Sequence, residues 1–278
     1  MSQSSPLIAH RSPLVSVLIL NYGAGRSAVE CVKALQKQSI ADQLEIIVID
    51  NHSCDDSIGI LRTNLRGIKN VRIVETPGNH GFGYGYNKGV QYARGKYLLI
   101  NNPDKRLEPT GLEKLVHEMD RDSTIGILGP KLVHPDGTRR LSIRRDPRLI
   151  DLISRRSIAG KVFDKALDRY LMLSADSDKI QDVDWVVGGC FLISREFFTA
   201  LDGFDARFFL FFEDADLCRR CRTHGKRVVY FPLVQALDRP RRLSGESFWD
   251  LISTRIGRIH MVSALQYFWK WRGGEKVR

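Results

Sequence analysis

The sequence predicts an α/β fold in which a mostly parallel central sheet carries helices on both faces and is followed by a C-terminal amphipathic helix. Short runs rich in Val, Ile and Leu alternate with segments of helical periodicity, an arrangement typical of parallel sheets. Several of these runs end in Asn or Asp, as strands do where they enter a turn. The 278 residues are 43% hydrophobic and 27% charged, which excludes disordered and collagen-like proteins.

The first part of the chain alternates strands and helices. Val29, Val32 and Leu35 recur at helical spacing between two apolar runs of strand length. Residues 55–57 offer capping side chains for a second helix. We expect strands over 15–20, 45–50 and 71–74, a helix over 27–38, and another from residues 55–57 to about 65.

The same alternation continues to about residue 130 and is then interrupted. Residues 141–179 are basic and weakly patterned, which predicts a mobile insertion or irregular helices. Residues 185–194 form another apolar stretch, with Gly188 and Gly189 in its middle. Further elements are predicted as a helix over 82–94, a strand over 97–100, a helix over 110–119, a strand over 125–128 and a helix over 195–201.

Several classes of protein are disfavoured by simple counts. The longest apolar runs, such as residues 208–212, are far shorter than the ~20 residues of a membrane-spanning helix. The first fourteen residues lack the apolar region of a secretory signal, so we expect a cytoplasmic protein. Five cysteines at irregular spacing predict no disulfide framework. Cys218 and Cys221 lack the second ligand pair of a zinc site.

The net charge of +11 is concentrated in two segments. Residues 139–161 contain eight basic and two acidic residues, and residues 239–278 contain nine and three. Segments of this kind favour a polyanion or an anionic surface as a partner. In the second segment aromatic and aliphatic residues recur among the cations at helical spacing. That pattern fits a helix on anionic lipid headgroups, and it fits equally a helix packed on its own domain.

Polar residues follow three of the predicted strands. Asn21 and Tyr22 follow the first, Asp50 the second, and Asn102 and Asp104 the fourth. In open parallel sheets, ligands bind beyond the carboxyl ends of the strands, so these residues are expected to face one cleft. A carboxylate there can accept hydrogen bonds from a base or ribose, or bind a divalent cation. Turn chemistry alone also explains Asp50 and Asp104.

Two further stretches carry candidate chemistry. Residues 79–89 are glycine-rich but lack the spacing and the position of a dinucleotide fingerprint. Residues 208–212, four of them Phe, run directly into Glu213, Asp214 and Asp216. Acids at a helix start can act as caps. A carboxylate that emerges from an aromatic wall is also desolvated and suited to accept a proton, so a general base is the favoured interpretation.

Five ordered stretches together resemble family 2 glycosyltransferases, and most closely their bacterial rhamnosyltransferase-like branch. The similarity extends from about residue 15 to about residue 244. It implies a GT-A fold and inverting transfer of a sugar from a nucleotide-diphosphate donor, with Mg or Mn. The stretches are VSVLILNY at 15–22, IDNHSCD at 49–55, NHGFG at 79–83, NPD at 102–104 and FEDADL at 212–217.

The resemblance also implies a role for each matching residue. Asp214 is the catalytic base, with Glu213 beside it, and Asp104 holds the metal. Asp238 stands where the family has a metal-binding His, six residues after a Pro that closes the last strand. The donor site is implied to comprise Asn21, Tyr22, Asp50, Asn79, Gly81, Phe82, Asn87 and Asn102. The acceptor site is implied to comprise Trp185, Gly188, Gly189 and Asp216.

These expectations divide the chain into a tail (1–14), a GT-A domain (15–244) and a basic helical C-terminus (245–278). Within the domain, 15–130 is the nucleotide-sugar half and 131–244 the acceptor half. The branch suggests transfer of rhamnose from dTDP-rhamnose to a glycan or lipid-linked acceptor in cell-wall polysaccharide synthesis, at the inner face of the membrane. A sugar nucleotidyltransferase is the alternative enzyme. A nucleic-acid-binding module is the non-enzymatic alternative, although its phosphates would repel the strand-end carboxylates, so no nucleic-acid partner is expected.

Overall fold

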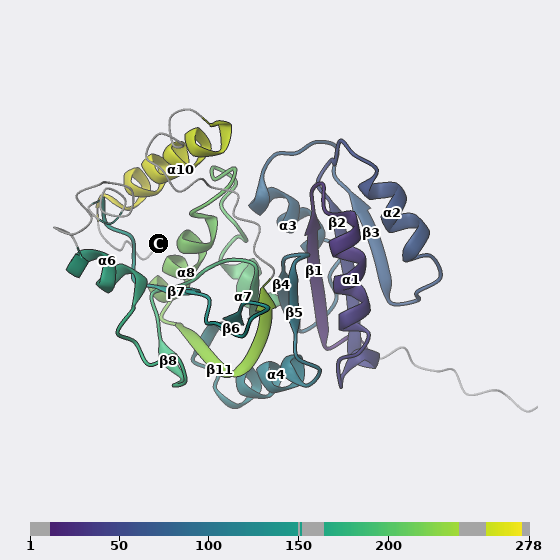
Figure 1. Cartoon of the computed structure of the whole chain (residues 1–278), viewed down its shortest axis with the longest axis horizontal. Coiled ribbons are helices and arrows are strands. Elements are labelled where there is room, and N and C mark those ends of the chain that lie inside the picture. Colours follow the sequence, from purple (N-terminus) through teal and green to yellow (C-terminus); the bar gives the residue numbers. More distant parts are fainter. Residues whose placement is uncertain (1–11, 150, 152–163, 239–253, 274–278) are drawn as a thin grey trace, which may run out of the picture.

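The computed structural model describes residues 12–149, 151, 164–238 and 254–273 and places a curled mixed sheet at the centre of the chain (Figure 1). Nine of the described strands form this sheet, in the order β3-β2-β1-β4-β10-β6-β11-β5, with β8 paired to β11. Two more, β7 and β9, pair separately. The strands are β1 (Val15–Asn21), β2 (Leu44–Asp50), β3 (Val71–Glu75), β4 (Tyr97–Asn101), β5 (Lys105–Leu107), β6 (Ile125–Val133), β7 (Ile143–Arg144), β8 (Gln181–Asp182), β9 (Trp185–Val186), β10 (Cys190–Ser194) and β11 (Arg227–Asp238).

The N-terminal half of the sheet matches the predicted architecture. Strands β1 to β4 are mutually parallel, and alternate residues of β1 enter two cores on opposite faces. Val17 packs in the core that contains α1, whereas Leu18 packs in the core that contains α3. The predicted covering of both faces by helices is therefore confirmed. The helical elements are α1 (Gly25–Leu35), η1 (Ala41–Gln43), α2 (Ser57–Asn64), α3 (Phe82–Val90), α4 (Gly111–Arg121), α6 (Asp164–Leu171), α7 (Arg195–Ala200), α8 (Glu213–Thr223) and α10 (Arg255–Trp271).

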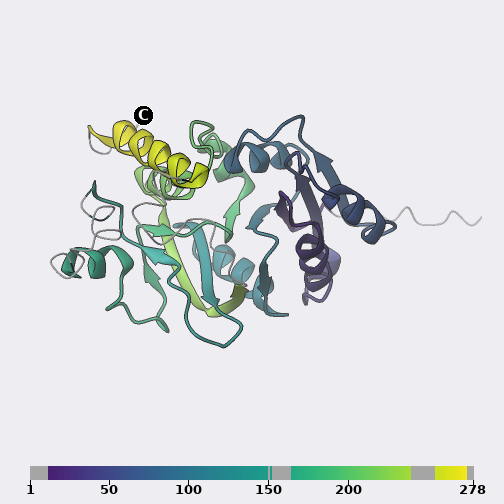
Figure 2. The ribbon, with the colours of Figure 1, turned by 45° about the horizontal axis from the view of Figure 1, so that its top comes forward.

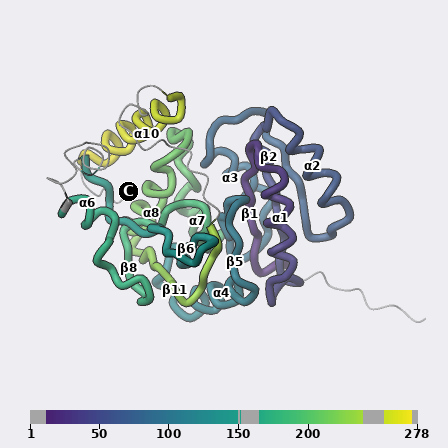
Figure 3. Tube along the Cα trace, viewed as in Figure 1, coloured from purple at the N-terminus to yellow at the C-terminus, as the bar shows by residue number. Residues whose placement is uncertain are grey.

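The C-terminal half departs from a simple parallel pattern. Strand β10 lies antiparallel between β4 and β6, which brings residues 190–194 back to the centre of the sheet. In Figure 3 the purple and blue N-terminal half and the green C-terminal half lie on opposite sides of the molecule. Strand β11 does not end at Pro232, as the sequence suggested. It continues to Asp238 across an irregularity between Phe231 and Gln235, where a missing proline N–H is tolerated. The predicted helix over 82–94 is also too long, because α3 ends at Val90.

The basic segment 141–179 is partly structured. Residues 143–144 pair with β9, and α6 covers residues 164–171, while 150 and 152–163 lie outside the described residues. In the described part of this segment, a regular helix (α6) and a short strand (β7) therefore stand where irregular helices were predicted.

Helix α10 lies against α8 (Figures 1 and 2). Its inner face is fixed by Ser263, whose Oγ donates to the carbonyl of Leu210 over 2.9 Å, and by the buried ring of Tyr267. Packing on its own domain thus accounts for one face of this helix. Residues 239–253 of the predicted basic C-terminus lie outside the described part. Among the described helices, none combines the length and the hydropathy needed to span a bilayer.

Candidate active site

Asn21 and Asp50 lie side by side where β1 and β2 end. The amide Nδ2 of Asn21 donates to Asp50 Oδ1 over 2.6 Å, and Ser53 donates to Asp50 through its Oγ (2.7 Å) and its backbone N–H (3.0 Å). These contacts keep the Asp50 carboxylate buried, whereas the neighbouring Tyr22 is exposed. Strand β1 has β2 on one side and β4 on the other, so the strand order reverses at β1. In open α/β sheets, ligands usually bind at the carboxyl ends of the strands at such a point.

The turn from Asn79 to Gly81 joins this edge to the aromatic run near α8. Asn51 donates through Nδ2 to Asn79 Oδ1 (3.0 Å) and to the carbonyl of Gly81 (3.2 Å). Gly81 has φ +109, and a Cβ there would come within 2.4 Å of the carbonyl oxygen of Phe209. That carbonyl accepts the backbone N–H of Phe82 over 2.7 Å. Only glycine fits this close approach, which joins the turn after β3 to the loop before α8.

Two predicted donor-site residues of helix α3, Asn87 and Phe82, pack against neighbouring residues. Asn87 donates through Nδ2 to the carbonyl of Phe204 (2.8 Å) and accepts the Phe204 N–H through Oδ1 (2.9 Å). Its assignment to the donor site is corrected, because both polar atoms of the side chain are occupied. The ring of Phe82 lies 4.8 Å from that of Tyr86 and 6.0 Å from that of Phe204, within an aromatic cluster.

The loop after β4 reaches α8 through the glycine pair. The N–H of Asn102 donates to the carbonyl of Gly189 over 2.6 Å, and the N–H of Gly188 donates to Asp214 Oδ2 over 2.5 Å. A Cβ on Gly189 would lie 2.7 Å from Asn102 Nδ2, and one on Gly188 would lie 2.8 Å from Asp214 Oδ2. Both glycines are therefore needed for this approach. They bring the segment with Asp104 and the predicted base, 110 residues apart in the chain, to one place.

Asp214 lies in the first turn of α8 with both carboxylate oxygens bonded to backbone amides. Besides the Gly188 contact, Oδ1 accepts the N–H of Ala215 over 2.8 Å. Burial raises the pKa of Asp214, and the amides of Gly188 and Ala215 partly offset that rise. The preceding residues Phe211 and Phe212 have φ of +72 and +68, a strained conformation found at functional sites.

Glu213 differs from Asp214 in having no such support. Burial and the adjacent Asp214 charge raise the pKa of Glu213 well above its usual range. Its Oε2 is buried without a hydrogen-bond partner among the described residues. Because the backbone amides favour the charged form of Asp214, we assign the proton of this pair to Glu213 and the negative charge to Asp214.

The two predicted metal ligands meet across a lysine. Lys105, buried at its ammonium group, lies 2.9 Å from Asp104 Oδ2 and 2.5 Å from Asp238 Oδ1. Arg140 Nε lies 2.6 Å from the second oxygen of Asp238. Asp238 therefore has a cation at each oxygen, although its Oδ2 makes no hydrogen bond, and Asp104 Oδ1 is likewise buried without a hydrogen-bond partner in the described part of the chain.

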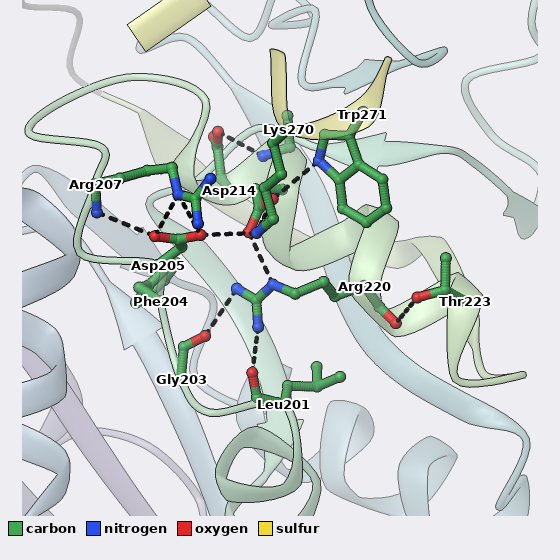
Figure 4. Close-up of polar contacts among 12 residues, drawn as sticks. Leu201, Gly203, Phe204, Asp205, Arg207, Asp214, Arg220, Thr223, Lys270 and Trp271 are labelled. Carbon is green, nitrogen blue, oxygen red and sulfur yellow. Dashed lines mark hydrogen bonds and ion pairs between the residues drawn. The ribbon is translucent and has the colours of Figure 1, made fainter. Parts of the chain in front are cut away.

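Asp216 is completely buried and ties α8 to α10. Its Oδ2 pairs with Arg220 Nε (2.8 Å), and its Oδ1 accepts from Lys270 (2.6 Å) and from the indole N–H of Trp271 (3.0 Å). Figure 4 shows the side chains of Lys270, Trp271 and Arg220 pointing toward one carboxylate. The predicted acceptor role of Asp216 is corrected, since the residue has no free oxygen and no exposure.

The geometry is accompanied by a match over most of the chain. The model of glycosyl transferase family 2 matches residues 16–200. This chain belongs to that family. Among its relatives is N-acetylglucosaminyl-diphospho-decaprenol L-rhamnosyltransferase of Mycobacterium tuberculosis, 26% identical over 242 residues, which span 82% of this chain and 77% of the relative. The predicted membership of glycosyl transferase family 2 is confirmed, and the similarity to a rhamnosyltransferase agrees with the branch that the sequence resembles.

Solved structures with a similar fold are also glycosyltransferases. The mannosyltransferase PcManGT from Pyrobaculum calidifontis, in complex with GDP-Man and Mn2+, has a TM-score of 0.62 at 20% identity, over 97% of this chain and 67% of that one. GalNAc-T7, solved with UDP, GalNAc and Mn2+, has a TM-score of 0.63 at 17% identity, over 87% of this chain. This chain spans 47% of that longer protein. The predicted GT-A fold is thereby confirmed.

The residues of this family 2 transferase fit a divalent cation at one point. Asp104 Oδ1 is buried and unpaired, and a cation held by one carboxylate takes its other ligands from phosphate oxygens and water. Asp238 offers a cation less room, because Lys105 and Arg140 lie beside its oxygens, and its role as a metal ligand stays a prediction. Within the described residues, no three His, Cys, Asp or Glu side chains are grouped to hold a metal.

Sequence reasoning overlooked Lys105 and Asn51. Lys105 directly follows Asp104, and a lysine at the end of a buried strand is rarely buried without a paired carboxylate. Asn51 likewise follows Asp50 and anchors the Asn79 turn. In both cases the signal was a polar residue next to one already singled out, but its partner could only be found in the folded transferase.

Proposed function

We propose that this chain is an inverting glycosyltransferase that moves a sugar from a nucleotide-diphosphate donor to a hydroxyl of a lipid-linked glycan. The observation that carries this proposal is the position of Asp214, which is held by the Gly188 amide and joined through Gly189 to the loop that contains Asp104. The name of the Mycobacterium tuberculosis relative suggests rhamnose as the sugar and a diphosphate lipid as the acceptor carrier. dTDP-rhamnose is the donor that we propose, and cell-wall polysaccharide synthesis is the setting.

Asp214 acts as the general base in a single displacement. Its carboxylate takes the proton of the acceptor hydroxyl while that oxygen forms a bond to the anomeric carbon. The bond from that carbon to the diphosphate oxygen breaks, and the nucleoside diphosphate leaves with the electron pair. Attack opposite the leaving group inverts the anomeric centre. Trp185 and the pair Gly188-Gly189 border the position of the acceptor.

The donor is held by the edge of the sheet. Asn21, Tyr22 and Asp50 contact the nucleoside, and the turn with Asn79 and Gly81 closes that side. Asn102 and Asp104 lie toward the diphosphate. When bound at Asp104, Mg or Mn supplies positive charge that stabilises the departing diphosphate. The ammonium of Lys105, fixed between two carboxylates, keeps Asp104 oriented with one oxygen free.

A thermal-shift screen of nucleotide sugars, with and without Mn, tests the donor assignment. A ligand that binds only the folded chain raises its melting temperature, by an amount that grows with ligand concentration over Kd. We expect the largest rise for dTDP-rhamnose and Mn together. No shift with any nucleotide sugar would overturn the proposed function.

Metal removal gives a second expected outcome. Excess EDTA should abolish sugar transfer, and added Mn or Mg should restore it, because the departing diphosphate loses its main counter-charge. The rate of transfer is measured as the release of the nucleoside diphosphate. Full activity in excess chelator would contradict the metal assignment while leaving the family unaffected.

The place of action that we propose is the inner surface of the cell membrane. This rests on an exposed apolar row along the outer face of α10, made by Met261, Val262, Leu265 and Trp269. A helix with such a face and basic flanks binds anionic lipid interfaces. In a liposome flotation assay at low salt, the chain should be recovered in the floating fraction with anionic vesicles. A Leu265→Ser/Trp269→Ser double variant should stay in the bottom fraction. Wild-type chain that remains in the soluble fraction would defeat this localisation.

A further inference from the structure

A basic groove lies between α10 and the loop before α8. Its volume is about 300 Å3, at the lower end of the range for small-molecule sites. Three guanidinium groups and three apolar side chains line most of it: Arg207, Arg255, Arg258, Phe209, Ile259 and Val262. A groove with this lining suits a ligand that is both anionic and apolar.

Among the described residues, few counter-charges face the cations of the basic groove. Arg255 and Arg258 are exposed and have no ion pair with any residue that the structure describes, and α10 itself contains no carboxylate. Arg207 is fixed at Nε by Asp205, 2.8 Å away, and Asp205 is also paired with Lys270. The one carboxylate seen beside the groove among described residues is thus already matched by two cations.

Gln266 adds a polar contact to the same lining. Its Oε1 is buried and lacks a hydrogen-bond partner within the described part of the chain. A buried amide without a partner is costly unless something binds to it. This oxygen can accept a hydrogen bond from a hydroxyl or N–H group of a ligand, so it suits the sugar of the acceptor and not the phosphate oxygens.

The apolar wall continues out of the groove along α10. Val262 lines the groove and is also 52% exposed, and on the same side of the helix Leu265 is 66% and Trp269 is 70% exposed. Spacings of three and four residues place these side chains on one face. A hydrocarbon chain that leaves the groove at Val262 therefore meets apolar surface rather than charge.

The lining of the groove is connected to the start of α8, the helix that carries the proposed base. Phe209 lines it and stands five residues before Asp214, and the His260 ring packs against Phe211 and Phe212 at 4.9 and 5.3 Å. Phe212 directly precedes the first residue of α8. A head group bound in the groove is consequently held beside the end of α8 that carries the base.

We propose that the basic groove binds the diphosphate of the acceptor's lipid carrier, with the hydrocarbon chain along Val262, Leu265 and Trp269 and the acceptor sugar directed toward Asp214. This inference rests on the proposed function, because it assigns a place to the acceptor of that reaction. Guanidinium groups pair bidentately with phosphate oxygens, and three of them match the several charges of a diphosphate.

The test is a calorimetric titration of the full chain with farnesyl diphosphate, inorganic diphosphate and farnesol. Farnesyl diphosphate should bind at least about tenfold more tightly than either of the others. It alone has both a diphosphate for the guanidinium groups and a hydrocarbon chain for the apolar side chains. The double variant R255Q/R258Q should lose about 10- to 100-fold in affinity for farnesyl diphosphate, because each charged contact contributes about tenfold. The matched control R66Q/K69Q removes two exposed cations between α2 and β3 and should bind like wild type.

Three results would overturn the inference. Equal affinity for inorganic and farnesyl diphosphate would indicate a plain anion site. Equal loss in both double variants would indicate a general effect of charge. Binding to anionic vesicles without binding to farnesyl diphosphate would make the groove part of a membrane surface. Dissociation constants for the nucleotide sugar are measured in parallel: donor binding without lipid-diphosphate binding defeats this inference alone, whereas absent donor binding defeats the proposed function.

Discussion

The donor edge and the acceptor side of this transferase are built in different ways. At the donor edge, Asn21 and Asp50 are neighbours in adjacent parallel strands, and their side chains bond to each other and to a nearby serine. Where the acceptor side joins the rest of the sheet, charged residues connect segments far apart in sequence: Lys105, beside the proposed donor-site residue Asp104, and Asp238 are separated by 133 residues. The first arrangement follows from strand register, whereas the second exists only after the chain has closed on itself. We therefore expect substitutions at the donor edge to act mildly and locally, and those on the acceptor side to act strongly.

Asp214→Asn should give the largest effect. The amide keeps the shape of the carboxylate but cannot accept the hydroxyl proton, so transfer should fall about 100- to 10,000-fold. The Kd of the nucleotide sugar should stay within a few-fold of wild type, because the donor edge is untouched. Initial rates at saturating donor, together with calorimetry, measure both quantities.

Glu213→Gln is the matched control for that variant. Glu213 carries the proton of the pair, so a neutral amide of the same size should leave the rate within a few-fold. A large loss of rate in Glu213→Gln with full activity in Asp214→Asn would reverse the assignment of the base.

Asp238→Asn should give the largest loss of stability. It removes one of the two carboxylates beside the buried Lys105 ammonium and the counter-charge of Arg140, and losing these charge-assisted contacts should cost about 2–3 kcal/mol of unfolding free energy, since Asp104 still pairs with Lys105. At the donor edge, Asp50→Asn removes hydrogen bonds from neutral donors and should cost about 1–2 kcal/mol. Urea unfolding of both variants gives the comparison.

The same variant also tests whether Asp238 has a structural role or binds the metal. If Asp238 acts only through Lys105, the folded Asp238→Asn chain should bind Mn in the presence of nucleoside diphosphate with nearly wild-type affinity. Stability equal to wild type together with lost Mn binding would identify Asp238 as a ligand.

The contrast between the two sides also explains what sequence could predict. Strands β1 to β4 and the polar residues at their ends were predictable, because apolar periodicity and turn residues are local signals. Asp214 was predictable from an unusual junction of aromatic and acidic residues. The contacts of Asn87, Asp216 and Asp238 were not, because each depends on a partner supplied by packing: the backbone of Phe204, helix α10, and a lysine on β5. Strand continuation through Pro232 escaped prediction for a similar reason, since it depends on pairing with β6.

Gly188→Ala should give a smaller effect that reports on the base itself. The new Cβ would lie 2.8 Å from Asp214 Oδ2, so the amide and the carboxylate must move apart. A displacement of this kind at a reacting group costs about 10- to 100-fold in rate. The Gly188 amide also lowers the pKa of Asp214, which burial raises, so losing it should raise that pKa further. Transfer requires the ionised carboxylate and fails as the pH drops through this pKa. The acidic limb of kcat/KM should therefore move to higher pH in Gly188→Ala, whereas Gly137→Ala, in a turn where a new Cβ has no neighbour within 4 Å, should leave the limb in place. A rate that falls while the limb stays fixed would show that the Gly188 amide positions Asp214 without setting its charge, and that the acceptor side controls geometry rather than ionisation.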